Sequence, residues 1–148
     1  MYPLVAAHMI FLGLWGGLVL VEIVFEAQMF RGKMDEKSVA GLHRITDRLI
    51  ELPILVAVLL TGWLLWQQTG FDQALLAKVL FGLGAVVINV VCYVIVETRA
   101  ARALRATGAD DGDPGLRRLS IALAITITPG VLFAGIALFL SGQRIGWW

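Results

Sequence analysis

Four apolar stretches, each long enough to cross a lipid bilayer as an α-helix, dominate this sequence. They cover residues 4–25, 49–66, 74–96 and 121–140 of 148, and a membrane-spanning helix needs about 20 residues. Hydrophobic residues make up 59% of the chain, more than a water-soluble domain of this size carries. We therefore predict an all-α integral membrane protein that forms a single domain over residues 1–148. Its four helices are expected at about 3–30, 38–67, 72–105 and 115–142.

The basic residues are distributed unevenly, and this predicts the orientation of the helices. Ten of the twelve follow the first or the third apolar stretch: Arg31, Lys33, Lys37, Arg44, Arg48, Arg99, Arg102, Arg105, Arg117 and Arg118. The exceptions are Lys78 and Arg144. Cytoplasmic loops carry an excess of Lys and Arg, so both basic segments are expected in the cytoplasm.

Aromatic residues fall at the opposite ends of the predicted helices, as in an interfacial belt. They are Tyr2, Trp63, Trp66, Trp147 and Trp148. The sequence thus predicts an antiparallel bundle of four transmembrane helices with both termini on the extracytoplasmic side. The expected localisation is the bacterial inner membrane.

Two ionisable residues, His8 and Lys78, are expected at similar depths inside the membrane. At a rise of 1.5 Å per residue, His8 lies about 6 Å below the outer boundary and Lys78 about 9 Å below it. His43 falls at the cytoplasmic start of the second span, most of a membrane away. A haem held by His8 and His43 together is therefore not expected. Ionisable residues are costly in hydrocarbon and by default suggest a functional site.

The polar residues of three spans collect on one helix face each, because residues three or four apart share a face. These faces contain His8, Trp15, Glu22 and Glu26; Arg44, Asp47, Glu51 and Thr61; and Lys78, Gly82, Ala85 and Asn89. They are expected to point into the bundle, since lipid would penalise them. In the outer half, Gly82 and Ala85 would leave room for a flat cofactor beside His8. In the inner half, the carboxylates would be neutralised by Arg44, Arg48 and Arg99.

Each of these residues also has a purely structural interpretation. His8 could be a hydrogen-bonded packing residue, and Lys78 could extend its ammonium group to the outer headgroups. The inner carboxylates are expected to form an ion network with the arginines rather than a proton path or a cation site. His43 is expected at the membrane interface.

Several motifs occur in a fixed order along the chain: His8 followed by Trp15 and Gly16-Gly17, then Asp47-Arg48 ahead of Pro53, then Lys78 within Leu75-Leu-Ala-Lys78-Val-Leu. This order resembles a family of small four-helix membrane proteins that includes the HemJ-type protoporphyrinogen oxidases and the CopD copper-resistance domain. HemJ proteins usually carry Asn-Glu before the Pro of the fourth helix, where this chain has Ile127-Thr128.

The resemblance implies a b-type haem associated with His8, and it implies Lys78 as the functional partner of that histidine. A single histidine is the proximal haem ligand in many proteins. We therefore predict a haem-binding membrane oxidoreductase or electron-transfer protein, in which His8 is the metal ligand and Lys78 the catalytic residue. Trp15, Arg48 and Asn89 are expected at the same cofactor site. A porphyrinogen-type substrate and a quinone are the possible ligands.

Two other functions remain open from the sequence. A CopD-like copper transport or resistance protein would use His8 and methionine sulfur, which suit copper(I). Alternatively, the chain could be an accessory subunit of a membrane complex without chemistry of its own. Besides the lipid bilayer, a second copy or a complex partner is possible. The net charge of +1 gives no indication of nucleic-acid binding.

Overall fold

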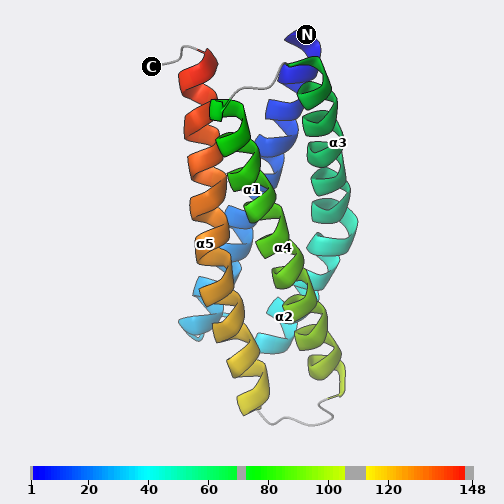
Figure 1. The fold of residues 1–148 in the computed structure, drawn as a ribbon. Helices are drawn as coiled ribbons and strands as arrows, with labels where there is room; N and C mark the ends of the chain where they lie inside the picture. The colour runs from blue at the N-terminus through cyan, green and yellow to red at the C-terminus, as the bar shows by residue number, and fades with distance from the viewer. Residues whose placement is uncertain (1, 70–72, 106–112, 146–148) are drawn as a thin grey trace.

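The computed structural model describes residues 2–69, 73–105 and 113–145, and every regular element in these ranges is helical. The elements are α1 (Tyr2–Phe30), α2 (Glu36–Thr46), η1 (Asp47–Glu51), α3 (Leu52–Gln68), α4 (Gln73–Arg105) and α5 (Pro114–Ile145). Because α2, η1 and α3 are continuous, the described chain forms four helices that are long and apolar enough to cross a membrane. The predicted all-α fold with four membrane-length helices is confirmed. Figure 1 shows α1 beginning and α5 ending at the same end of the molecule.

A wide turn, η1, interrupts the second membrane-length helix. In this π-helical turn the backbone N–H of Leu52 bonds to the carbonyl of Asp47, five residues back. Pro53 follows directly, and because proline has no N–H it cannot continue the regular pattern. Single π-turns are frequent at functional sites. Here the turn carries two acidic residues, Asp47 and Glu51, and both are buried.

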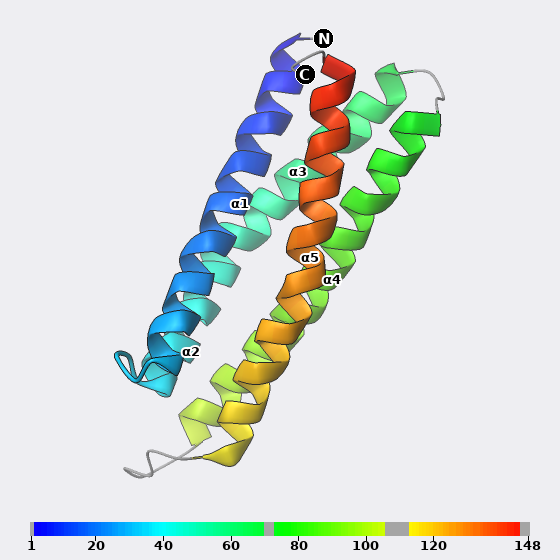
Figure 2. The same cartoon turned by 90° about the vertical axis from the view of Figure 1, so that its left-hand side faces the viewer.

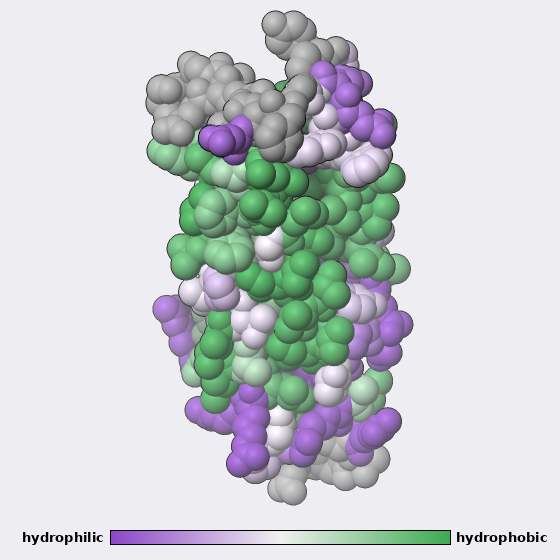
Figure 3. All heavy atoms as spheres, viewed as in Figure 1, coloured by the Kyte–Doolittle hydropathy of each residue, from purple (hydrophilic) through white to green (hydrophobic). Residues whose placement is uncertain are grey.

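The outer surface of the bundle is apolar over most of its height. Figure 3 shows a broad hydrophobic band, with hydrophilic side chains gathered toward the two ends. Large aliphatic side chains on every long helix are exposed, for example Leu20, Leu60, Val87 and Leu132. Such a surface is stable in lipid but not in water. The protein is therefore an integral membrane protein.

The helices pack mainly as two pairs, α1 with α3 and α4 with α5, and α2 joins them by packing against α4. The close packing of α4 and α5 can be followed in Figures 1 and 2. One core cluster connects the pairs at mid-height through Trp15 and Val19 of α1, Leu55 of α3 and Ala85 of α4. A second cluster, nearer the α2 end, joins Cys92 and Val96 to Leu123.

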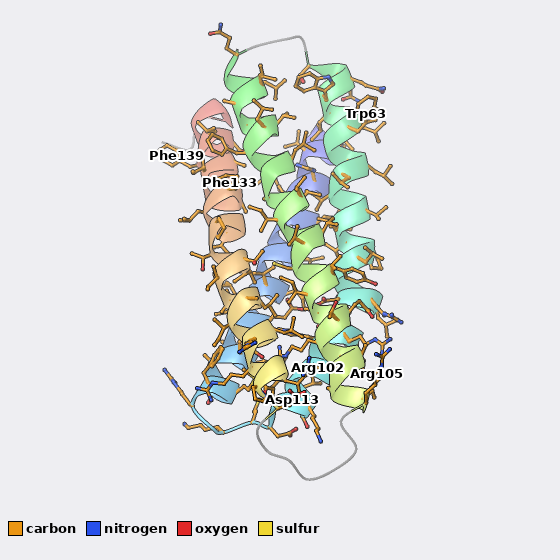
Figure 4. The ribbon with its side chains drawn as sticks, turned by 60° about the horizontal axis from the view of Figure 1, so that its bottom comes forward. Trp63, Arg102, Arg105, Asp113, Phe133 and Phe139 are labelled. Atoms are coloured by element: carbon orange, nitrogen blue, oxygen red, sulfur yellow. The ribbon has the colours of Figure 1, made fainter. Side chains whose placement is uncertain are left out.

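Polar contacts organise the end of the bundle that contains α2. Gly32, with φ +69°, turns the chain after α1. The side chain of Asp35 then accepts a hydrogen bond from the N–H of Ser38 at 2.8 Å and caps α2. Hydrogen bonding from the Ser38 side chain, together with this N–H, lowers the pKa of Asp35. Ahead of α5, hydrogen bonding from Arg102 lowers the pKa of Asp113. Figure 4 shows Arg102, Arg105 and Asp113 together at this end.

The opposite end of the bundle carries Trp63 on α3, exposed on the surface, while Phe133 and Phe139 lie on α5 toward the same end (Figure 4). The side chains of Tyr2 and Arg144 and the residues Trp147 and Trp148 lie outside what the structure describes.

Candidate functional site

His8 is held against α3 by a hydrogen bond to Thr61. Its Nδ1 lies 2.8 Å from the Thr61 Oγ1. The Thr61 hydroxyl in turn donates to the carbonyl of Ala57 at 2.7 Å. Because a hydroxyl has one proton to donate, we assign the proton of the His8 bond to Nδ1. The Nε2 of His8 then carries the free lone pair.

The backbone of α3 is close to the His8 ring because Gly62 has no side chain. A Cβ at this position would lie 3.2 Å from the Cε1 of His8. Lys78 of α4 is half-buried and lies in the neighbourhood of the His8 ring. The structure thus brings His8, Thr61 and Lys78 into one region from three different helices. Sequence reasoning had put Thr61 on an inward face but had not paired it with His8.

The room expected beside Lys78 exists only in part. Gly82 has open space where a side chain would be, since no atom lies within 4 Å of its Cβ position. Ala85, however, is buried in the cluster of Trp15, Val19 and Leu55. The expectation of free space beside Ala85 is therefore wrong, because the indole of Trp15 occupies that level of the bundle.

Trp15 and Asn89 both donate to one carboxylate oxygen, the Oε1 of Glu51. The distances are 2.9 Å from the Trp15 Nε1 and 2.7 Å from the Asn89 Nδ2. These bonds connect α1, η1 and α4 in the interior of the bundle. Two of the residues expected beside a cofactor are thus used to hold Glu51, which sequence reasoning had assigned to the ion network.

Three buried carboxylates gather around this point. Oxygen atoms of Glu22, Asp47 and Glu51 all lie within 4.8 Å of one another, and Glu22 also accepts a hydrogen bond from the Thr46 hydroxyl at 2.9 Å. Like charges so close in a low-dielectric interior cannot all be ionised. The three residues, named the carboxylate cluster below, must share protons or hold a cation. Their oxygen donors suit a hard cation such as Mg²⁺ rather than copper(I).

In the described part of the chain, the arginines form no ion pair with the carboxylate cluster. The ion pairs within the described residues lie at Glu26, Glu97 and Asp113 instead. Arg44 approaches Glu97 at 3.2 Å, and the Arg48 guanidinium donates to the same carboxylate. The expected network of Arg44 and Arg48 with the inner carboxylates is therefore wrong. Both arginines pair instead with Glu97 of α4, which is more exposed than the carboxylate cluster. Arg48 also lies apart from the region of His8.

Among the described side chains, Arg99 is the one arginine that forms an ion pair with an inner carboxylate. It is completely buried and forms an ion pair with Glu26. A second nitrogen of Arg99 approaches the Met29 sulfur at 3.0 Å. The Nδ1 of His43 lies 3.3 Å from the Glu26 carboxylate, without hydrogen-bond geometry.

His43 differs from the expectation of an interfacial residue, since its side chain is only 3% exposed. It is buried because α2 lies against α4, so its environment depends on the packing of two elements far apart in sequence.

The chain matches no family model, no curated protein and no solved structure.

Proposed function

We propose that this chain is a haem-binding integral membrane protein of the HemJ/CopD-like kind that acts as an oxidoreductase or electron-transfer protein. The observation that carries this proposal is the His8–Thr61 hydrogen bond at 2.8 Å. With the ring proton assigned to Nδ1, the Nε2 lone pair of His8 is the one that would bind a metal. Histidines that bind metals commonly donate their other ring N–H to an oxygen atom. That second bond orients the ring and selects the tautomer. The bond from His8 Nδ1 to the Thr61 hydroxyl is a second bond of this kind.

The residues around His8 are compatible with an axial haem ligand. Gly62 permits close approach of α3 to the ring, and Gly82, one helical turn from Lys78 on α4, has open space at its Cβ position. When bound, a haem supplies reversible one-electron transfer at its iron. Lys78 would act on the same site from α4, either as an ammonium that binds an anionic propionate or substrate, or as a second nitrogen ligand.

The carboxylate cluster supports a redox role because it can store protons. A group that shares protons can release or take up one when the charge nearby changes. Trp15 lies on α1 between His8 and Glu22 of the cluster; its indole donates to Glu51 and its ring packs in the mid-height core. In this proposal Trp15 and Asn89 act on Glu51 and hold it in position.

We further propose that the four helices run antiparallel, with the α2 end of the bundle in the cytoplasm and the termini outside. The distribution of the basic residues supports this orientation. In a bacterial cell the corresponding location is the inner membrane.

The test is the visible absorption spectrum of the detergent-purified protein, oxidised and dithionite-reduced, after expression with a haem precursor. We expect a Soret band, with α and β bands on reduction, that His8→Ala abolishes and Thr61→Val weakens or shifts. Thr98→Val is the matched control, because Thr98 is exposed and its hydroxyl donates to the carbonyl of Val94 in its own helix. A colourless wild-type protein would overturn the proposal. Metal analysis would then separate copper handling from an accessory role.

A further inference from the structure

A cavity of about 390 Å³ opens between α1 and α5 in the half of the bundle that contains α2. Most of its lining is apolar, and the polar or charged side chains in its wall are Glu22, Glu26, His43 and Thr128. Binding sites for small ligands are commonly about 300–1,000 Å³ in volume and combine apolar walls with a few polar groups. The cavity has the size and composition of such a site, and His8 is not among its lining residues.

The cavity is accessible from the lipid. Its rim includes Ile23 and Phe30 of α1 and Leu132 of α5, and all three side chains are exposed on the apolar surface. The backbones of α1 and α5 make little close contact with each other. A ligand would therefore enter sideways from the bilayer, which requires a molecule with a large apolar part.

Two acidic side chains line the cavity, and they differ in charge partner. Glu26 is paired with the buried guanidinium of Arg99. Glu22 belongs to the carboxylate cluster, with which the described arginines form no ion pair. The hydrogen-bond donors that reach this cluster from other described residues are uncharged groups: the Thr46 hydroxyl, the Trp15 indole and the Asn89 amide. The wall at Glu22 therefore contains an acid whose ionised form would be favoured by a cation in the cavity.

This charge distribution selects a cation that has an apolar body. An anion would be repelled by the carboxylates, and a bare inorganic ion would leave the apolar walls unfilled. A primary ammonium group brings a positive charge and three N–H donors, and ionised carboxylates only accept hydrogen bonds. Hydrogen bonds between ionised groups are roughly twice as strong as those between neutral groups. We propose that this cavity binds a lipid-soluble primary amine in its ammonium form, with the ammonium at Glu22 and the apolar body between α1 and α5.

The neighbours of Glu22 strengthen the attraction for a cation. Oxygen atoms of Asp47 and Glu51 lie within 4.8 Å of the Glu22 carboxylate, so an ammonium at Glu22 also reduces the repulsion among the three acids. Burial of a charge costs desolvation energy, and here this cost can be offset by three carboxylates rather than one. The binding does not depend on a haem at His8.

The experiment measures equilibrium binding of 4-phenylbutylamine, which is protonated at neutral pH. The full chain is held in phosphatidylcholine nanodiscs, and empty nanodiscs give the baseline. We expect saturable binding that is about tenfold tighter than that of 4-phenylbutanol, which has the same apolar body and a hydroxyl donor but no charge. Equal binding of the alcohol would overturn the proposal and identify an apolar groove. Absence of saturable binding would overturn it as well.

A charge-removing variant tests the role of Glu22. Glu22→Gln nearly preserves the size of the side chain, and we expect it to weaken ammonium binding about tenfold while binding of the alcohol changes little. Glu97→Gln is the matched control, because Glu97 lies outside the cavity wall and pairs with Arg44 and Arg48. This control should retain the wild-type preference for the ammonium. An unchanged preference in folded Glu22→Gln protein would contradict the assignment.

A variant that fills the cavity locates the binding. Ala124 lines the cavity, so Ala124→Phe is expected to weaken binding of both the ammonium and the alcohol. Ile125→Phe is the matched control, because Ile125 is the next residue of α5 and is 68% exposed. If Ala124→Phe does not fold, Leu132→Trp narrows the rim from an exposed position and replaces it. Unchanged ammonium binding in a folded variant with a blocked cavity would place the site elsewhere and overturn the proposal.

Discussion

The indole of Trp15 donates a hydrogen bond to the carboxylate of Glu51 across 2.9 Å, although the two residues are 36 positions apart in the sequence. Trp15 also packs in the mid-height core against Ala85 and Leu55. A single side chain therefore joins three helices and at the same time satisfies a buried acid.

Trp15→Phe tests this bond with little loss of apolar packing. Removal of the indole N–H leaves Asn89 as the remaining described donor to the Glu51 Oε1, and an under-satisfied buried acceptor costs about 1–3 kcal/mol. We expect a lower thermal unfolding midpoint in detergent. Trp63→Phe is the control because Trp63 is exposed on α3, and it should leave the midpoint nearly unchanged. Equal midpoints for Trp15→Phe and Trp63→Phe would show that the bond does not stabilise the fold.

Glu26 and Glu22 differ in charge partner although both are buried on α1, and this predicts opposite outcomes for the same substitution. Glu26→Gln leaves the buried Arg99 without its counter-charge and should destabilise the protein by about 3–5 kcal/mol. Glu22→Gln removes one acid from a cluster that already has to share protons, so its cost should be about 1 kcal/mol or less. Denaturant titration followed by circular dichroism compares the two. If Glu22→Gln proves the more harmful variant, our account of the carboxylate cluster is wrong.

Gly84 permits the close packing of α4 against α5. A Cβ at Gly84 would lie 2.6 Å from the ring of Phe133. This ring makes an edge-to-face contact with Phe81, with the two ring centroids 5.5 Å apart. Gly84→Ala should therefore cost about 1–3 kcal/mol through overpacking. Gly82→Ala, two residues away, meets no atom within 4 Å and should be neutral or slightly stabilising. The thermal unfolding midpoints of the Gly84→Ala and Gly82→Ala variants, measured in the same detergent, are compared. Equal midpoints would exclude a tight contact at Gly84.

Asp35 caps α2, and its charge makes the contribution dependent on pH. Asp35→Ala should cost about 1 kcal/mol, whereas Asp35→Asn retains a good capping residue and should cost much less. The folded-state pKa of Asp35 lies below its ordinary value of 3.8, so the charged cap stabilises the fold above that value. The stabilisation should be lost as the pH falls through the lowered pKa. A difference in the free energy of unfolding between wild type and Asp35→Asn that grows on acidification would contradict this assignment.

Sequence reasoning identified the inward-facing polar residues well but, apart from Arg99 as a partner of the inner carboxylates, not the groups that they meet. Helical periodicity places His8, Glu22 and Glu26 on one face of α1, because that pattern depends only on local geometry. Which group each of them meets depends on how the helices pack. Glu97 illustrates the difference, since its contacts with Arg44 and Arg48 redirect both arginines away from the interior.

Hydrophobicity by itself determined that this chain forms four membrane-length helices, because in lipid each backbone polar group must be satisfied within its own helix. The tertiary structure decided where the charges meet. The π-turn at η1 and the packing of α2 against α4 bury Asp47, Glu51 and His43. The tertiary structure also decided that Thr61 orients His8 and that Arg99 neutralises Glu26. These contacts join residues on different helices, and a periodic pattern within one helix carries no information about its neighbour.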